Sequence, residues 1–218
     1  MSLFVTLQYM KKSSPQPPVG GADDDPGARI LDVLHTEDAA NKAFEGAGVQ
    51  FFRLMMALED PAETGKPPGE WSGEVFRRLM DFLNNAHALM ALTGEMAALI
   101  GERPVHAQTP AGSFLEELRT CMKHRATPRM ALTQHPPPSP QKCVLRMELL
   151  EMISWPHWSA SARRFLHLHQ PALPLHAAVQ EYQQMLRMFR QRTLRTFREN
   201  FSEILAAAPP LPVMMHIM

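Results

Sequence analysis

The sequence has few of the features that mark a secreted or membrane protein. It has only two cysteines, Cys121 and Cys143, which form neither a CxxC pair nor a disulfide framework, so we expect a reducing compartment. The most apolar window, residues 88–100, is too short for a membrane span. The short apolar opening is followed by lysines instead of being preceded by them, unlike a secretory signal. We therefore expect a soluble, cytoplasmic protein.

Sequence signatures of catalysis are also lacking. There is no GxSxG, no glycine-rich phosphate loop, no serine or cysteine triad signature and no HExxH. Ten histidines are present, and His157, His167, His169 and His176 lie close together in the sequence. On a helix, however, His167 and His169 would point about 200° apart, and no cysteine or run of carboxylates accompanies them. We predict no metal site among these histidines.

The net charge is zero, which argues against bulk attraction to nucleic acid or to a membrane surface. The charge is nevertheless divided: residues 1–118 hold 9 Lys/Arg and 17 Asp/Glu, whereas residues 119–218 hold 13 and 5. We expect the two parts to complement each other within one fold. Five arginines lie close together, and we expect most of them to be solvated and one or two to reach a buried anion: Arg187, Arg190, Arg192, Arg195 and Arg198.

Proline and glycine divide the chain into three parts. We expect a flexible N-terminal segment at residues 1–26, a single helical domain at 27–208 and an irregular tail at 209–218. The proline run at 136–140 can be neither helix nor central strand. The chain contains no internal repeat.

The fold class predicted from apolar periodicity is all-α, because no window has the alternation of a strand or the signal of a hairpin. Two long helical stretches precede Gly101, which we expect to end the second of them. A shorter helix from Ser113 has Ser113 and Glu116 as a capping box. Residues 142–153 and 159–168 are predicted to form two further short helices.

Residues 174–207 are predicted to form one long amphipathic helix around which a helical bundle packs. Pro174 suits its first turn. Thr193 stands out on its apolar stripe as a short hydroxyl between two phenylalanines. The stripe comprises Val179, Tyr182, Leu186, Phe189, Thr193, Phe197, Phe201 and Ile204.

Several segments resemble the indoleamine 2,3-dioxygenase family. Residues 51–59, FFRLMMALE, and the helix that follows are similar to its core helices. Residues 161–166, SARRFL, are similar to its His-Arg-x-Phe-Leu element, and residues 141–145 to its Gln-Ser-Ser stretch. Residues 189–195, FRQRTLR, are similar to its Phe-Arg-x-x-His-Leu helix. The resemblance covers approximately residues 44–207.

This resemblance implies an all-helical haem pocket and a chemistry in which dioxygen is inserted into an indole ring. Arg190 matches the arginine that precedes the iron ligand and would pair with a haem propionate. Phe189 and Thr193 would also contact the haem. The ligand histidine itself is replaced by Thr193, whose hydroxyl is a poor donor to iron. The proline run at 136–140 replaces the family's distal loop, which implies a divergent or truncated member.

Two functions remain open from the sequence. The first is a haem-binding, dioxygenase-like protein that would act on a small, tryptophan-type aromatic substrate if it is active. The second is a non-catalytic helical protein-binding or scaffold protein that uses methionine-rich surfaces and has a protein partner. If the alignment holds, Thr193→His should gain the axial haem ligation that the natural chain lacks.

Overall fold

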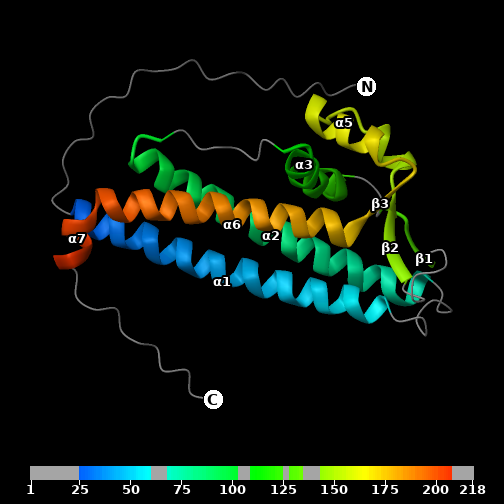
Figure 1. Cartoon of the computed structure of the whole chain (residues 1–218), viewed down its shortest axis with the longest axis horizontal. Helices are drawn as coiled ribbons and strands as arrows, with labels where there is room; N and C mark the ends of the chain where they lie inside the picture. Colours follow the sequence, from blue (N-terminus) through cyan, green and yellow to red (C-terminus); the bar gives the residue numbers. More distant parts are fainter. Residues whose placement is uncertain (1–24, 60–67, 103–108, 125–127, 135–142, 208–218) are drawn as a thin grey trace, which may run out of the picture.

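Three long helices form the body of the computed structural model (Figure 1). The structure describes residues 25–59, 68–102, 109–124, 128–134 and 143–207, so most of the predicted N-terminal segment and the whole predicted tail lie outside the described residues. The elements within these ranges are α1 Pro26–Leu58, α2 Pro68–Leu99, α3 Pro110–His124, β1 Met130–Gln134, β2 Cys143–Glu148, α4 Leu150–Ile153, α5 Ala160–Leu168, β3 Ala172–Pro174, α6 Leu175–Asn200 and α7 Ser202–Ala207.

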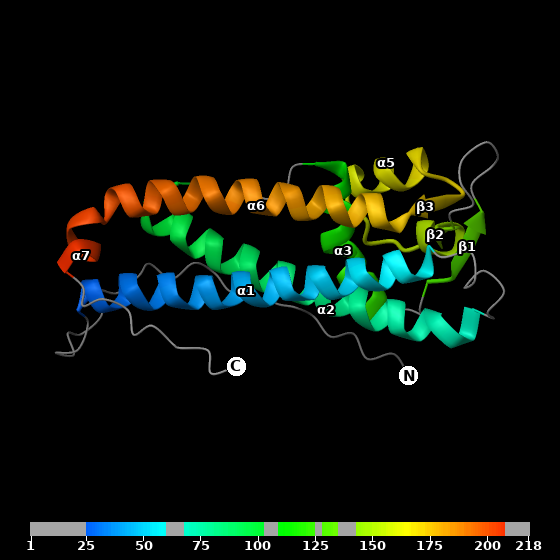
Figure 2. The same cartoon turned by 60° about the horizontal axis from the view of Figure 1, so that its bottom comes forward.

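The apolar stripes of α1, α2 and α6 pack into a three-helix bundle (Figures 1 and 2). α1 runs antiparallel to both α2 and α6. Phe82 of α2 lies where the three helices meet. Its ring centroid is 5.3 Å from that of Phe44 and 6.2 Å from that of Phe51, both on α1, and 6.4 Å from that of Tyr182 on α6. These separations are typical of aromatic pairs that stabilise a core.

Gly101 ends α2, as the sequence predicts. Its φ angle is +73°, in the left-handed region that glycine adopts at little cost. The Gly101 amide donates to the Ala98 carbonyl at 3.1 Å, and the Glu102 amide donates to the Ala97 carbonyl at 2.8 Å. This pattern is the Schellman motif, which satisfies the last carbonyls of a helix.

A small antiparallel sheet, in the order β1-β2-β3, contradicts the prediction that the chain has no strands. Leu132 pairs with Leu145, and Met147 pairs with Leu173. The predicted helix at 142–153 is therefore wrong for residues 143–148, and only α4 at its end is helical. Leu145 and Met147 are buried on either side of the half-buried Arg146, which is the two-residue alternation of a strand. The proline run at 136–140 lies outside the described residues.

The helix α3 connects the bundle to the rest of the molecule. Its Phe114 ring stacks on Phe165 of α5, with centroids 5.1 Å apart, and also contacts Trp158 at 5.5 Å. The helix begins at Pro110, and the Gly112 amide donates to Thr109 Oγ1 at 3.0 Å. The predicted capping box at Ser113 is therefore wrong, because this residue lies inside the helix. Glu116 is left without the expected role at the helix start.

The predicted long helix at 174–207 is divided into α6 and α7. Phe201 separates them with φ −115° and ψ 24°. The chain is mostly helical, as predicted, and α6 is one of three long helices in the bundle. Within the described ranges, none of the helices combines the length and the apolar character that a membrane span requires.

Candidate functional site

Three pairs of acidic and basic side chains join α1 to α6. Glu37 pairs with Arg190, Glu45 with Arg187, and Glu59 with His176, whose Nδ1 lies 3.1 Å from Glu59 Oε1. Each pair joins a residue of the acidic part of the chain to one of the basic part. The predicted complementarity of the two parts is thereby confirmed.

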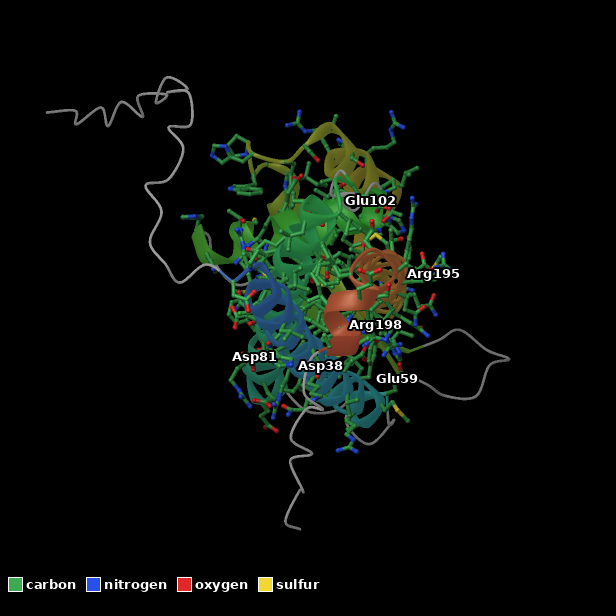
Figure 3. The ribbon with its side chains drawn as sticks, turned by 90° about the vertical axis from the view of Figure 1, so that its left-hand side faces the viewer. Asp38, Glu59, Asp81, Glu102, Arg195 and Arg198 are labelled. Atoms are coloured by element: carbon green, nitrogen blue, oxygen red, sulfur yellow. The ribbon has the colours of Figure 1, made fainter. Side chains whose placement is uncertain are left out.

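Glu37 and Arg190 form a two-point ion pair inside the bundle. Arg190 Nε donates to Glu37 Oε1 at 2.5 Å and Nη2 donates to Oε2 at 3.1 Å, and Asp38 Oδ1 lies 4.0 Å from Arg190 Nη2. The Glu37 side chain is fully buried, and that of Arg190 is 17% exposed. One arginine of the predicted cluster thus reaches a buried anion. Arg195 and Arg198, in contrast, are exposed and have no ion-pair partner within the described ranges (Figure 3).

A layer of polar side chains divides the apolar interior of the bundle. The larger apolar cluster reaches Phe44, Leu89 and Leu186 on the three long helices, and the smaller one is centred on Met96 and Phe197. Four residues lie between them along the helices, and we refer to them as the polar layer: Glu37, Thr93, Arg190 and Thr193.

The two threonines of the polar layer differ in their hydrogen bonds. Each is only 1% exposed. Thr93 Oγ1 donates to the Leu89 carbonyl one turn earlier, at 2.8 Å. Thr193 Oγ1 is buried and has no hydrogen-bond partner among the described residues. An unpaired buried hydroxyl costs about 1–3 kcal/mol, so Thr193 is a locally unfavourable position.

The structure places two of the three predicted haem contacts in the polar layer. Arg190 and Thr193 lie one turn apart on α6, and Phe189 beside them is half-buried. As they are placed here, these side chains do not fit a haem. Glu37 holds two nitrogens of the Arg190 guanidinium, and the Thr193 hydroxyl is enclosed by helices. A propionate would have to displace a fully buried carboxylate. Haem binding stays a prediction, and we derive no chemistry from it.

The four clustered histidines point to different partners. His167 Nδ1 lies 3.0 Å from Gln170 Nε2, and His169 Nδ1 lies 2.9 Å from the Phe165 carbonyl oxygen. The ring of His157 packs against Trp155, with centroids 5.4 Å apart. Within the described ranges, no group of three or more His, Cys, Asp or Glu side chains could hold a metal ion.

Glu116 on α3 is a functional candidate that the sequence does not single out. Its Oε1 atom is buried without a hydrogen-bond partner among the described residues. Burial, together with the adjacent Glu117, raises the pKa of Glu116 to about 7. Burial also raises the pKa of Tyr182 on α6, and the Glu116 carboxylate adds to this rise. The two side chains are therefore near enough for the charge of one to act on the other.

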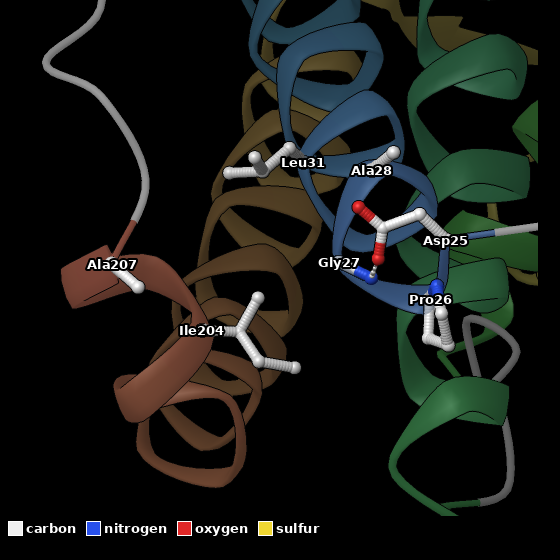
Figure 4. Close-up of a pocket in the computed structure, with 7 residues that line it drawn as sticks. All are labelled: Asp25, Pro26, Gly27, Ala28, Leu31, Ile204 and Ala207. Atoms are coloured by element: carbon white, nitrogen blue, oxygen red, sulfur yellow. Dashed lines mark hydrogen bonds between the residues drawn. The ribbon is translucent and has the colours of Figure 1, made fainter.

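Two grooves lie elsewhere on the molecule. One, of about 520 Å³, runs between α3 and the segment before α5 and is lined by Glu117, Thr120, His124, Trp155 and His157. The other, of about 570 Å³, lies between the start of α1 and α7, where the Asp25 carboxylate accepts a hydrogen bond from the Gly27 amide (Figure 4). Neither groove contains the residues that the sequence predicts for haem.

An apolar stripe is exposed on the surface of α1. Val49 is 47% exposed and Met56 is 67% exposed. Phe52 lies between them in the sequence and is half-buried, with its ring centroid 5.1 Å from that of His176 on α6. We refer to Val49, Phe52 and Met56 as the α1 stripe.

Comparisons with known proteins leave the family open. The sequence matches no protein-family model, and neither the curated proteins nor the solved structures contain a match to it. The resemblance to the indoleamine 2,3-dioxygenase family therefore depends only on the residues quoted above.

Proposed function

We propose that this chain is a non-catalytic helical binding protein whose α1 stripe receives an amphipathic helix from a partner protein. The exposure of Val49 and Met56 is the observation that carries the proposal. Contiguous exposed apolar residues with a polar rim are typical of protein-binding surfaces. An amphipathic helix that lies in a groove is a common form of such recognition.

The spacing of the α1 stripe suits a helical partner. Val49 and Met56 are seven residues apart, so their side chains project from the same side of α1 about 10 Å apart. A partner helix with apolar residues at i, i+3 or i+4, and i+7 would match that distance. The stripe lies beside the α1–α6 contact, because Phe52 touches His176.

The rim of the α1 stripe limits the charge of the partner. Glu45 is paired with the Arg187 guanidinium before the stripe, and Glu59 lies 3.1 Å from His176 Nδ1 after it, so each of these carboxylates already has a partner. On α6, Gln180 lies between His176 and Arg187 and is exposed. Arg53 of α1 is one turn from both Val49 and Met56 and is exposed too. We expect a partner helix with an apolar face and acidic or neutral hydrogen-bonding residues at its margin.

The placement of Arg190 and Thr193 favours this proposal over a haem-dependent reaction. A dioxygenase-like pocket would need a cavity beside these residues and a guanidinium available to a propionate. Glu37 already occupies the Arg190 guanidinium, and Thr193 is 1% exposed. Haem-dependent, dioxygenase-like chemistry is accordingly left as a second proposal, which titration with haemin tests.

Site-specific photo-crosslinking in the full chain tests the proposal. A benzophenone amino acid replaces Met56 in one variant and Met188 of α6 in a second. Met188 is a matched control, since it is 71% exposed and belongs to a different helix. We expect position 56 to crosslink to one discrete protein at an amphipathic helical peptide. Adding Val49→Asp should remove that product.

Each alternative result contradicts the proposal in a recognisable way. Equal products from positions 56 and 188 would indicate random collisions. A crosslink from position 56 to a peptide of this same chain would indicate self-association instead of a partner protein. Survival of the product in the Val49→Asp variant would show that the α1 stripe does not make the contact.

A further inference from the structure

α3 carries two neighbouring carboxylates that face different parts of the molecule. Glu117 accepts a hydrogen bond from the Ser159 amide at 2.7 Å and so caps the start of α5. Residues adjacent on a helix project about 100° apart, so Glu116 faces elsewhere. Its charge acts on Tyr182 of α6, so Glu116 lies near the α3–α6 contact. Glu117, in contrast, contacts the start of α5.

The neighbours of Glu116 leave its negative charge uncompensated. Glu117 on the same helix repels it, and its Oε1 atom is buried without a partner among the described residues. The Tyr182 hydroxyl on α6 is itself unfavourably placed for ionisation. Arg119 acts on Tyr182 and on His87 of α2, whereas both causes of the shift at Glu116, its burial and Glu117, disfavour the charged form. An ionised carboxylate without a partner at an interface is costly.

We propose that Glu116 is a proton-operated latch: α3 packs firmly against α6 while Glu116 carries a proton, and it loosens when that proton is lost. In the described ranges the charged and titratable groups linked to the latch are Glu117, which acts on Glu116, and Arg119 of α3, which together with Glu116 acts on Tyr182 of α6. His87 of α2 lies near Arg119, and its own pKa is lowered by burial, by Arg119 and by Lys123.

The pKa difference sets the pH range and the size of the effect. In the closed form the pKa of Glu116 is about 7, against 4.5 when the side chain is exposed. From pH 6 to pH 8 the statistical weight of the open form, summed over both protonation states of Glu116, rises about 100-fold, and that of the closed form rises about 10-fold. The open form should therefore increase about tenfold relative to the closed form over this interval.

Amide hydrogen exchange of α3 measures that opening. The amides of Leu118 and Met122 are followed at pH 6 and pH 8, after correction for the intrinsic exchange rate at each pH. In the wild-type chain we expect their protection to fall about tenfold between the two values. In Glu116→Gln, which keeps the shape without the charge, we expect the protection to be independent of pH.

Glu117→Gln is the matched control, because it removes the same charge one position away. It relieves the repulsion that raises the pKa of Glu116 in the closed form, so the loosening of α3 should persist but be smaller and be complete at a lower pH. Equal pH dependence in the wild type and Glu116→Gln would overturn the proposal, as would constant protection in the wild type. A direct NMR titration of the Glu116 carboxyl carbon should give a midpoint near 7, whereas a midpoint near 4.5 would also overturn the latch.

Discussion

At the scale of single residues, the burial of the Glu37 carboxylate is energetically unfavourable. The helix α1 holds a fully buried carboxylate where an apolar residue would pack, and its charge is offset by Arg190, whose Nη2 also lies 4.0 Å from Asp38 Oδ1. Removing a charge from water costs several kcal/mol, and a good partner recovers only part of that cost. Each residue should therefore be needed chiefly to compensate the charge of the other, and the pair as a whole should add little to the free energy of unfolding.

Single and double substitutions of this pair separate the two contributions. Glu37→Gln leaves Arg190 without its buried counter-ion and should lower the free energy of unfolding by about 2–4 kcal/mol. The double variant Glu37→Leu/Arg190→Met should lie close to wild type, since no charge is left to desolvate. Urea unfolding followed by circular dichroism measures both values. A double variant as unstable as the single one would show that the ion pair itself stabilises the fold.

Thr193 provides the residue-scale test of haem binding. Wild-type protein and the variants Thr193→His and Thr193→Val are titrated with haemin and followed by absorption. We expect the spectrum of free haemin from all three, because Glu37 holds Arg190 and the layer is closed. A Soret band that develops at one haem per chain with Thr193→His, and not with Thr193→Val, would contradict this expectation and favour the dioxygenase-like proposal.

At the scale of elements, α1 approaches α6 closely at one glycine. A Cβ atom added at Gly48 would lie 2.6 Å from Gln183 Nε2, whereas one added at Gly46 meets no atom within 4 Å. Gln183 is buried, and its Nε2 donates to Glu45 Oε2 at 3.2 Å. The missing side chain at Gly48 therefore makes room for the hydrogen bond that joins the two helices.

The two glycines give a matched pair of substitutions in one helix. Gly46→Ala should stabilise the protein by about 0.5–1 kcal/mol, because alanine restricts the unfolded chain and favours the helix. Gly48→Ala gains the same propensity but displaces Gln183, so it should be neutral or destabilising by about 1 kcal/mol. Thermal unfolding of both variants compares them. Equal stabilisation by the two would mean that Gln183 moves without cost.

How far the sequence predicts these elements depends on how local their causes are. The long helices and the end of α2 at Gly101 follow from periodicity and backbone preference within a short window, and they were predicted. The strand at Leu145 and Met147 needs hydrogen-bonding partners from β1 and β3, which no window of β2 contains. The break between α6 and α7 at Phe201 likewise has no nearby proline or glycine from which it could be predicted.

The same distinction applies to the candidate site. Arg190 could be expected to reach a buried anion from the charge division, but its partner Glu37 is 153 positions away along the chain. Glu116 was interpreted as a capping residue because the spacing from Ser113 fits that motif. Its true surroundings depend on how α3 docks against Tyr182, which only the assembled fold determines.

At the scale of the whole molecule, the charge division becomes an arrangement of helices. Acidic side chains of α1 and basic side chains of α6 meet along an antiparallel contact, so a chain with no net charge has an ordered internal pairing. The large apolar cluster that includes Phe82 provides most of the buried apolar surface of the bundle. The ion pairs add directional contacts that apolar packing lacks.

The polar layer also fixes how the three helices are aligned along their axes. Apolar side chains are interchangeable enough that a bundle could shift one helix by two turns and still bury its stripe. Here a shift of α1 by seven residues would move Glu37 to the level of Phe44. The Glu37 carboxylate would then lie among aromatic rings, and Arg190 would no longer have Glu37 opposite it. Misaligned assemblies are thereby penalised, and one alignment of α1 with α6 is selected.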